Sequence, residues 1–442
     1  MTRFLFATMP AAGHVTPGLP VARELADRGH DVHWYTGAVY REAIEAAGAT
    51  HHPIVSAYDF GGLGIDEAFP ELTGLTGLTM VRQALQRTFI DSGPGMLRDL
   101  QAILEAFPAD VAVSEALFVA TRWLHELGGP PWATLGESML GTYSRDTAPF
   151  GPGLFPRGGP LGRARNLTMN ALHRRVVFGP VTARYEQARG EVGLPPLGRS
   201  FLDTLTSPFL YLQGTVPSFE YPRSDLPAHV HFVGPLLPDP PDAFTPPSWW
   251  GEMRSSTRPV VLVTQGTIAN DPRLLIAPTI DALADEPVLV IATTGAPVDA
   301  ALAALGGKLP ANARLEPFIP YGELLPHVSA LVTNGGYGGL QQALAHGVPI
   351  VVAGATEDKP ETAARVAWSG AGLRLRAQSP EPERIKAAVR RLFDEPSYGR
   401  RARELAAEMG TYDAPRIAAD LLEQLAGTRQ PVRAAAHIVG SS

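Results

Sequence analysis

The stretch Val332-Thr333-Asn334-Gly335-Gly336-Tyr337-Gly338-Gly339-Leu340-Gln341-Gln342-Ala343-Leu344-Ala345-His346-Gly347-Val348-Pro349 decides the fold of this 442-residue chain. The short apolar run over residues 329–333 predicts a strand. Apolar residues at helical spacing over residues 340–344 predict a helix that ends at Gly347. The glycines between them permit backbone conformations that are closed to other residues. The order strand, glycine turn, helix is typical of an α/β sheet.

The glycine turn is also a candidate anion site. Backbone N–H groups at the start of a helix have no partner inside the helix, and the helix dipole adds partial positive charge there. A diphosphate suits such a site and needs no metal ion. For the glycines alone, an ordinary tight turn between strand and helix is the favoured interpretation, because such turns are common in α/β folds.

A wider pattern carries a family resemblance. It runs from Phe318-Ile319-Pro320 through Asn334-Gly335-Gly336 and Gly347-Val348-Pro349 to Asp358-Lys359. This pattern resembles the donor-binding signature of the GT-B family 1 glycosyltransferases, and especially the bacterial macrolide and natural-product enzymes. The resemblance implies an α/β GT-B fold in which two Rossmann-like domains face each other across a cleft. The acceptor would bind the N-terminal domain and the nucleotide sugar the C-terminal domain.

The donor-binding residues follow from the same resemblance. They are Gly266, Thr267, Phe318, Ile319, Asn334, Gly335, Gly336, Tyr337, Gly338, Gly339, Gln342, Glu357, Asp358 and Lys359. The family uses its turn for the diphosphate, the backbone near residues 318–319 for the base, and residues 357–359 for the sugar. Where the family has His, Ser or Thr, Glu and Gln, this chain has Asn334, Gly339, Gln342 and Lys359. These departures leave the identity of the sugar open.

The N-terminus predicts a second strand–turn–helix unit. An apolar run over residues 3–9 is a strand, residues 10–15 are a loop, and Thr16 is a candidate N-cap before a helix. Gly29 ends that helix, and residues 31–36 form the next strand, which predicts a right-handed crossover in a parallel sheet. His14 therefore lies beyond the carboxyl end of a strand, where ligands bind in open α/β sheets.

His14 is a candidate general base. A lone loop histidine is usually a polar surface residue, but the order Gly13-His14-Val15-x-Pro17 resembles the opening of the family, whose histidine is the base. Such a base needs a carboxylate that fixes its tautomer and stabilises the imidazolium. The resemblance places Glu115, at the end of the strand over residues 110–115, where the family has an aspartate. Asp110 falls at the wrong end of this strand.

The acceptor pocket is expected in two loop-rich regions of the N-terminal half. Long loops in a compact domain are usually functional or disordered, and in this family they build the acceptor site. Apolar side chains there suggest a bulky apolar acceptor such as a macrolide, polyketide or flavonoid, although each fits an ordinary core equally well. The candidate residues are Phe60, Phe89, Phe118, Met139 and Phe150.

The chain length suggests two or three domains. We expect an acceptor domain over residues 1–234, a proline-rich linker over 235–259 without regular helix, and a donor domain over 260–410. A helix over 411–428 would cross back to the N-terminal domain, and 429–442 would be a flexible tail.

Composition excludes several classes of protein. The absence of cysteine removes disulfides and thiolate chemistry, and a net charge of -7 argues against a nucleic-acid partner. No apolar run approaches the roughly 20 residues of a membrane span, and no signal-peptide pattern is present, so we expect a cytoplasmic protein, monomeric or homodimeric. No Asp-x-Asp appears, so we expect metal independence.

The sequence therefore predicts an inverting glycosyltransferase that uses a UDP- or TDP-sugar, with glucose from UDP-glucose as the expected donor and no further cofactor. A non-catalytic GT-B protein that binds a nucleotide or assists a partner is the first alternative, because four donor positions are altered. The pair His14 and Glu115 argues against it. A UDP-sugar epimerase of the same fold is the second, but the sequence identifies no acidic groups for that reaction. No G-x-G-x-x-G with a downstream acidic residue supports a dinucleotide oxidoreductase.

Overall fold

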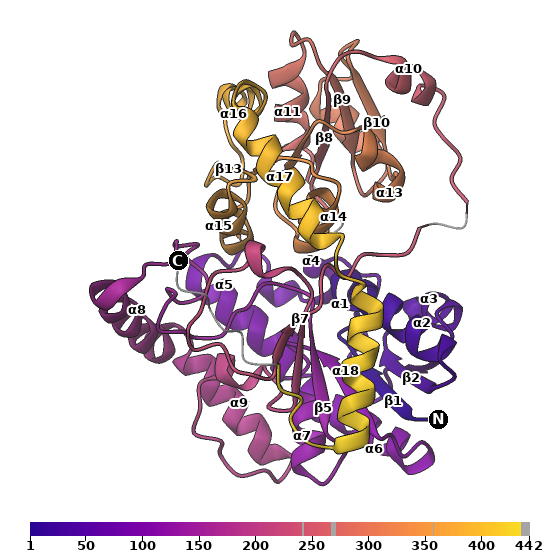
Figure 1. Cartoon of the computed structure of the whole chain (residues 1–442), viewed down its shortest axis with the longest axis vertical. Coiled ribbons are helices and arrows are strands. Elements are labelled where there is room, and N and C mark those ends of the chain that lie inside the picture. The colour runs from indigo at the N-terminus through magenta and orange to yellow at the C-terminus, as the bar shows by residue number, and fades with distance from the viewer. Residues whose placement is uncertain (241–242, 267–270, 357, 435–442) are drawn as a thin grey trace.

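The computed structural model describes residues 1–240, 243–266, 271–356 and 358–434 (Figure 1). In this part of the chain the strands form two sheets, one in each half of the sequence, and every strand pairing is parallel. The predicted α/β class is confirmed. Thr267 and Glu357, two of the predicted donor residues, lie outside the described residues.

The N-terminal sheet has seven strands among the described residues, in the order β3-β2-β1-β4-β5-β6-β7. Its strands are β1 (Arg3–Ala7), β2 (Asp31–Thr36), β3 (Thr50–Pro53), β4 (Val111–Glu115), β5 (Trp132–Gly136), β6 (Leu210–Gln213) and β7 (Val230–Phe232). The chain reverses its direction of winding between β1 and β4, which are neighbours. The carboxyl ends of these two strands form the switch point at which open α/β sheets bind ligands.

The C-terminal sheet has six strands in the described residues, in the order β10-β9-β8-β11-β12-β13. Its strands are β8 (Val260–Thr264), β9 (Leu289–Thr293), β10 (Ala313–Glu316), β11 (Ala330–Thr333), β12 (Ile350–Val352) and β13 (Gly372–Arg374). Central strands such as β8 are apolar and buried along their whole length, because helices cover both faces of a parallel sheet. The switch point here lies between β8 and β11, and the glycine turn follows β11 directly.

Helices pack on both faces of each sheet (Figure 1). The α-helices are α1 (Ala12–Val15), α2 (Leu19–Asp27), α3 (Arg41–Ala46), α4 (Ile65–Ala68), α5 (Gly77–Ala84), α6 (Gly93–Ala106), α7 (Ala120–Glu126), α8 (Gly159–Leu172), α9 (Gly179–Glu191), α10 (Trp250–Ser255), α11 (Ile276–Leu283), α12 (Asp299–Ala304), α13 (Tyr321–Leu324), α14 (Tyr337–Ala345), α15 (Lys359–Ser369), α16 (Pro382–Asp394), α17 (Pro396–Met409) and α18 (Ala414–Thr428). Short 3-10 segments are η1 (Thr16–Gly18), η2 (Ala38–Tyr40), η3 (Pro70–Leu72), η6 (Phe201–Thr204), η7 (Pro217–Phe219) and η8 (Leu325–His327), and η4 (Leu85–Ile90) and η5 (His173–Val177) are π-helical.

The first helical segment begins earlier than predicted. We expected a loop over residues 10–15 and an N-cap at Thr16, but α1 starts at Ala12 and continues through η1 into α2. Thr16 has helical dihedral angles and is not the N-cap of any of these helical segments. Its backbone N–H instead donates to Ala12 O and so continues the turn. His14 is therefore held on a helical turn rather than in a loop.

The C-terminal helix α18 packs against the N-terminal sheet, as Figure 1 shows. Its apolar residues Ala418 and Leu422 are buried with Phe4 of β1 and Val21 of α2. The backbone after α18 is also attached to that domain, because Val432 is buried and its N–H donates to Phe209 O at 2.8 Å. The prediction of a flexible tail from residue 429 is therefore wrong as far as residue 434, and the remaining residues lie outside the described range.

The proline-rich segment is not irregular throughout. Helix α10 forms at residues 250–255, after the last closely spaced proline at Pro247. Trp250 and Met253 of this helix are buried in the core of the C-terminal half. The prediction that residues 235–259 lack regular helix is wrong in this part, because two tryptophans supply enough apolar surface to fix a short helix. No helix in the described part of the chain is long and apolar enough to cross a membrane.

Candidate active site

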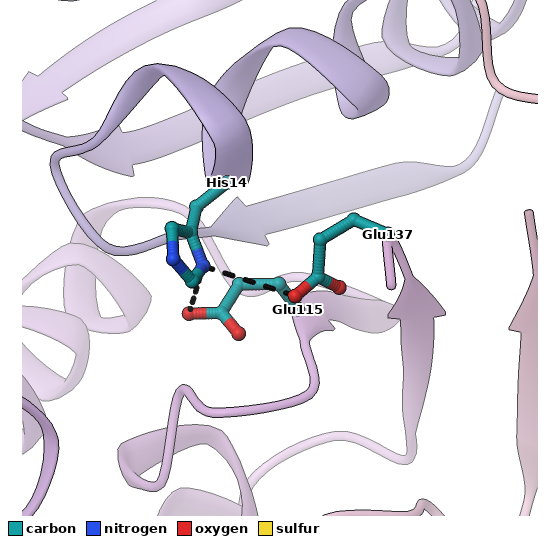
Figure 2. A group of neighbouring side chains, drawn as sticks. All are labelled: His14, Glu115 and Glu137. Atoms are coloured by element: carbon teal, nitrogen blue, oxygen red, sulfur yellow. Dashed lines mark ion pairs between the residues drawn. The ribbon is translucent and has the colours of Figure 1, made fainter. Parts of the chain in front are cut away.

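Three side chains meet where neighbouring strands of the N-terminal sheet end (Figure 2). His14 projects from α1 after β1, Glu115 is the last residue of β4, and Glu137 follows β5. Nδ1 of His14 lies 3.3 Å from Oε1 of Glu115 and 3.8 Å from Oε1 of Glu137. Because β1, β4 and β5 are adjacent in the sheet, their carboxyl ends bring these groups together without long loops.

The two carboxylates are withdrawn from solvent while the imidazole stays accessible. The side chain of His14 is 22% exposed, whereas those of Glu115 and Glu137 are 0% and 8% exposed. The backbone N–H of Leu117 donates to Oε2 of Glu115 and fixes that carboxylate. The dashed lines of Figure 2 join Nδ1 to both carboxylates, and Nε2 is the ring nitrogen that takes part in neither ion pair. The ring can therefore receive a proton at Nε2 while Nδ1 faces negative charge.

Burial and charge act in opposite directions on His14. Burial lowers the pKa of His14, but the carboxylates of Glu115, Glu137 and Asp358 outweigh it, and the pKa rises from 6.5 to about 9. Burial raises the pKa of Glu137 well above its ordinary value, and the charge of Glu115 adds to this rise. The site thus binds protons more tightly than its isolated side chains would.

The donor motif of the C-terminal half approaches this group. Asp358 lies just before α15, and its Oδ2 accepts a hydrogen bond from Oγ of Ser138 at 3.4 Å. Ser138 directly follows Glu137, and the Asp358 charge acts on His14 as described above. A predicted donor residue thus lies near the candidate base, although the two are 344 positions apart in the sequence.

The glycine turn has the conformation that its sequence predicts. Gly335 has φ +99°, and a Cβ there would lie 2.7 Å from Val352 Cγ1 and 2.9 Å from Thr362 Oγ1. Gly336 precedes α14, whose first residue is Tyr337, and Gly347 ends the segment with φ +70°. Among the described residues, a Cβ at Gly336 or Gly338 would meet no atom within 4 Å. These glycines place no side chain beside the first turn of α14.

Asn334 and Lys359 both lie close to a third glycine, Gly354. A Cβ at Gly354 would clash with the Asn334 carbonyl oxygen and would lie 2.8 Å from Lys359 Cβ. Asn334 is buried, and its Nδ2 donates to Gln265 O at 2.5 Å. Lys359 is the first residue of α15, but it is only 5% exposed, so its side chain does not lie on a solvated surface. The two predicted donor positions that depart from the family are therefore close neighbours beyond the carboxyl ends of β11 and β12.

The other donor candidates differ in how they can contact a ligand. The side chain of Phe318 is 73% exposed, which leaves its ring free to stack on a base, whereas Ile319 is buried in the core. Tyr337 is also buried and lies against Phe219, so only its backbone faces the turn. Gln342 is half-buried and donates to Gly338 O at 3.4 Å along its own helix. Gly266 follows β8 with φ +71°, and Gly339 lies within the first turn of α14.

The five acceptor candidates do not form one wall. Phe89 lies beside the candidate base, with its ring centroid 5.9 Å from that of His14. Phe150 packs against the main cores of both halves. Phe60 and Phe118 are buried in the core of the N-terminal half, and Met139 is buried in that of the C-terminal half. Phe89 and Phe150, both half-buried, are the two that can reach an acceptor.

Glu137 was not among the predicted site residues. We took it as the start of an irregular loop, although it directly follows the apolar run of β5. The resemblance identified His14 and Glu115. Both lie at the carboxyl ends of parallel strands, and Glu137 has the same position after β5. Within the described residues, His14, Glu115 and Glu137 are also the group of side chains that could share a metal ion, with ligand atoms within 4.8 Å of one another.

Comparison with known proteins places this geometry in a family. Residues 280–425 match the model of the erythromycin biosynthesis protein CIII-like C-terminal domain. The chain is 50% identical to the 4'-demethylrebeccamycin synthase of Lentzea aerocolonigenes over 425 residues, which cover 96% of this chain and 99% of that protein. It is 36% identical to UDP-glycosyltransferase 2 of Phaeomoniella chlamydospora, with 96% and 95% covered.

A solved structure shows the same fold. The calicheamicin glycosyltransferase CalG4 superposes with a TM-score of 0.73 at 24% identity, over 97% of this chain and 99% of that one. At this identity the likeness supports the GT-B fold alone, and it confirms the predicted architecture. Together with a half-identical relative that matches almost the whole length, it shows that this chain is an enzyme of the GT-B family 1 natural-product glycosyltransferases.

Proposed function

We propose that this glycosyltransferase transfers glucose from UDP-glucose, with inversion, to a hydroxyl group of a bulky apolar small molecule. The observation that carries the proposal is the meeting of His14 and its carboxylates with Asp358 of the donor motif. A base on one sheet and a nucleotide-binding turn on the other are the two parts that direct displacement at an anomeric carbon requires. Phe89 beside His14 supports an apolar acceptor.

The reaction follows from this arrangement. Nε2 of His14 takes the proton of the acceptor hydroxyl, and the oxygen attacks the anomeric carbon from the face opposite the diphosphate. The bond between the anomeric carbon and the diphosphate oxygen breaks, and the nucleoside diphosphate leaves with both electrons. The N–H groups at the start of α14 and the amide of Asn334 stabilise the leaving group. Glu115 stabilises the imidazolium that forms on His14.

A product assay tests the function directly. The purified enzyme is incubated with UDP-glucose or with TDP-glucose and a set of hydroxyl-bearing macrolides, polyketides and flavonoids, and the products are analysed by mass spectrometry. We expect a mass gain of one hexose on at least one acceptor, with UDP-glucose preferred. Strict preference for TDP-sugars would overturn the donor assignment. Tight UDP binding without transfer to any acceptor would favour a non-catalytic protein that binds the nucleotide.

Metal independence is a separate prediction. Nothing in the proposed leaving-group site requires a divalent cation, because the N–H groups at the start of α14 can carry the diphosphate charge. We expect the transfer rate in excess EDTA to equal the rate without chelator. Activity lost in EDTA and restored by Mg²⁺ or Mn²⁺ would contradict this, and the group of His14, Glu115 and Glu137 would then be the first candidate metal site.

The neighbouring positions Asn334 and Lys359 are expected to act together. An amide cannot carry the positive charge that the family's histidine offers the diphosphate, and a charged donor is about twice as strong, a difference of around 1 kcal/mol. If Lys359 compensates, Asn334→His should restore more activity to a Lys359→Gln variant than it adds to the parent enzyme. The measurement is a double-mutant cycle on the transfer rate with one fixed donor. Additive effects would show that the two residues are not coupled, and Lys359 would then act in sugar recognition alone.

A further inference from the structure

We propose that Glu137 is a positioning residue that shares a proton with His14 and Glu115, and thereby sets how weakly acidic an acceptor group the enzyme can deprotonate. This inference rests on the proposed function of His14 as the base. The predicted His14 and Glu115 pair already supplies one carboxylate, so the second carboxylate needs a reason of its own. Its placement indicates one.

Glu137 faces the same nitrogen as Glu115 does. Its Oε1 lies 3.8 Å from His14 Nδ1, and Glu115 Oε1 lies 3.3 Å from the same nitrogen, so the two distances differ by only 0.5 Å. Its side chain is 8% exposed, and no other described group forms a hydrogen bond with its Oε2. Figure 2 shows the carboxylate approaching the imidazole from a strand next to that of Glu115. A buried carboxylate without its own cation is costly unless it holds a proton or a partner.

The charged groups that act most strongly on His14 are all carboxylates. Glu115 approaches from the end of β4, Glu137 from the end of β5, and Asp358 from the turn before α15. On the side of η4 the neighbour is the uncharged ring of Phe89. Two carboxylates this close to each other do not both ionise easily, so the group retains a proton that an isolated histidine–carboxylate pair would release.

This retained proton can bind at either of two positions, His14 or Glu137. In one form Nε2 of His14 carries it, so that an imidazolium faces two carboxylates and the base is blocked. In the other form Glu137 carries it, His14 is neutral with Nδ1–H directed at Glu115, and Nε2 is free to act. The two forms exchange the proton through water. When Nε2 then takes the acceptor proton, Glu137 releases its own proton to water, and the new imidazolium is stabilised by two carboxylates.

A strong but partly blocked base suits a particular class of acceptor. The excess of acidic groups makes neutral His14 a stronger base than a histidine with one partner, and proton transfer from weakly acidic groups gains most from a stronger base. We therefore assign aliphatic hydroxyls, rather than acidic phenols, as the groups for which Glu137 matters. A phenol releases its proton readily and gains little.

NMR titration of His14 in the free enzyme tests the shared proton without any transfer assay. With ¹⁵N-labelled histidine, and His14→Gln to identify the signal, we expect His14 to titrate in two coupled steps with its pKa raised. In Glu137→Gln the titration should become a single step, shifted down by about one pH unit or more. Glu137→Asp should fall between the two. An unchanged titration in Glu137→Gln would overturn the proposal.

Kinetics test the consequence for the acceptor. In Glu137→Gln we expect the rising limb of kcat/KM to move to lower pH and the rate above that limb to fall roughly tenfold for an aliphatic alcohol. The loss for a phenol should be clearly smaller, and the KM for the donor should stay the same. Equal losses for both acceptors would show a merely structural role and overturn the proposal.

A matched control is available in the same domain. Glu423 of α18 lies 2.8 Å from Nε2 of His30, which directly precedes β2 and so lies at the opposite end of the sheet from His14. Glu423→Gln therefore also removes a carboxylate from a histidine. It should leave the His14 titration and the kinetic profile unchanged. If no acceptor is ever glycosylated but the His14 titration changes as expected, the proposed function fails while the proton sharing stands. If transfer occurs and the titration does not change, the reverse holds.

Discussion

His14→Ala is expected to lower kcat by a factor of about 10² to 10⁴ on a hydroxyl acceptor, because the proton then leaves without a positioned base. Nucleotide binding should be unchanged, since His14 lies on the N-terminal sheet and the glycine turn on the C-terminal one. The measurements are single-turnover rates and the affinity for the free nucleoside diphosphate. In the parent enzyme kcat/KM should fall as the pH drops below about 9, because protonated His14 cannot accept a proton.

The control for this prediction is Glu115→Gln, which keeps the size of the side chain and removes its charge. Its effect should be milder than that of His14→Ala, because Nδ1 can still donate to the amide oxygen. The limb of the pH profile should move to lower pH, since Glu115 is the largest of the acidic influences that raise the pKa of His14. Near-normal turnover of His14→Ala on an unactivated alcohol would remove His14 as the base.

The fold could be predicted because its signals are local. Gly335 must adopt a positive φ and tolerate Val352 and Thr362 at close range, so the glycine turn marks a strand–helix junction in the sequence itself. Buried parallel strands such as β8 appear as continuous apolar runs. The predictions were wrong where tertiary contacts, rather than the local sequence, determine the structure of a segment. Trp250 forms a helix inside a proline-rich segment because a core receives it, and Val432 fixes a terminal segment because β6 and β7 offer it a partner.

The site was predictable only one residue at a time. The family resemblance pointed to His14 and Glu115, and the structure places them 3.3 Å apart. Glu137 has no counterpart in the motif that was used, and only the adjacency of β4 and β5 brings it to the same nitrogen. The burial of a single loop residue likewise cannot be read from a sequence. Phe318 and Ile319 are neighbours in the chain, yet one is 73% exposed and the other 1% exposed.

The second large effect concerns a buried ionic group that links the two halves of the chain. Arg365 of α15 lies 2.7 Å from Glu220, which belongs to the N-terminal half, and 3.1 Å from Glu361 of its own helix. Glu361 in turn accepts hydrogen bonds from the N–H groups of Gly151 and Gly153 at 2.8 Å. All three charged side chains are at most 5% exposed. Helix α15 is thus fixed to the N-terminal half by charge.

Removing the cation of this group should greatly lower the free energy of unfolding. In Arg365→Met two buried carboxylates lose their common partner, and breaking a buried pair in this way costs about 3–5 kcal/mol. We expect the midpoint of chemical denaturation to fall accordingly. Adding Glu361→Gln to this variant should recover part of the loss, because one of the two uncompensated charges is then removed.

A surface pair provides the comparison. Arg416 and Asp413 lie 3.2 Å apart, but their side chains are 60% and 56% exposed, so Arg416→Met should change the free energy of unfolding by less than about 1 kcal/mol. The double variant separates charge from packing, because methionine replaces most of the volume of Arg365 in both backgrounds. Stability of Arg365→Met equal to that of the parent would contradict the prediction.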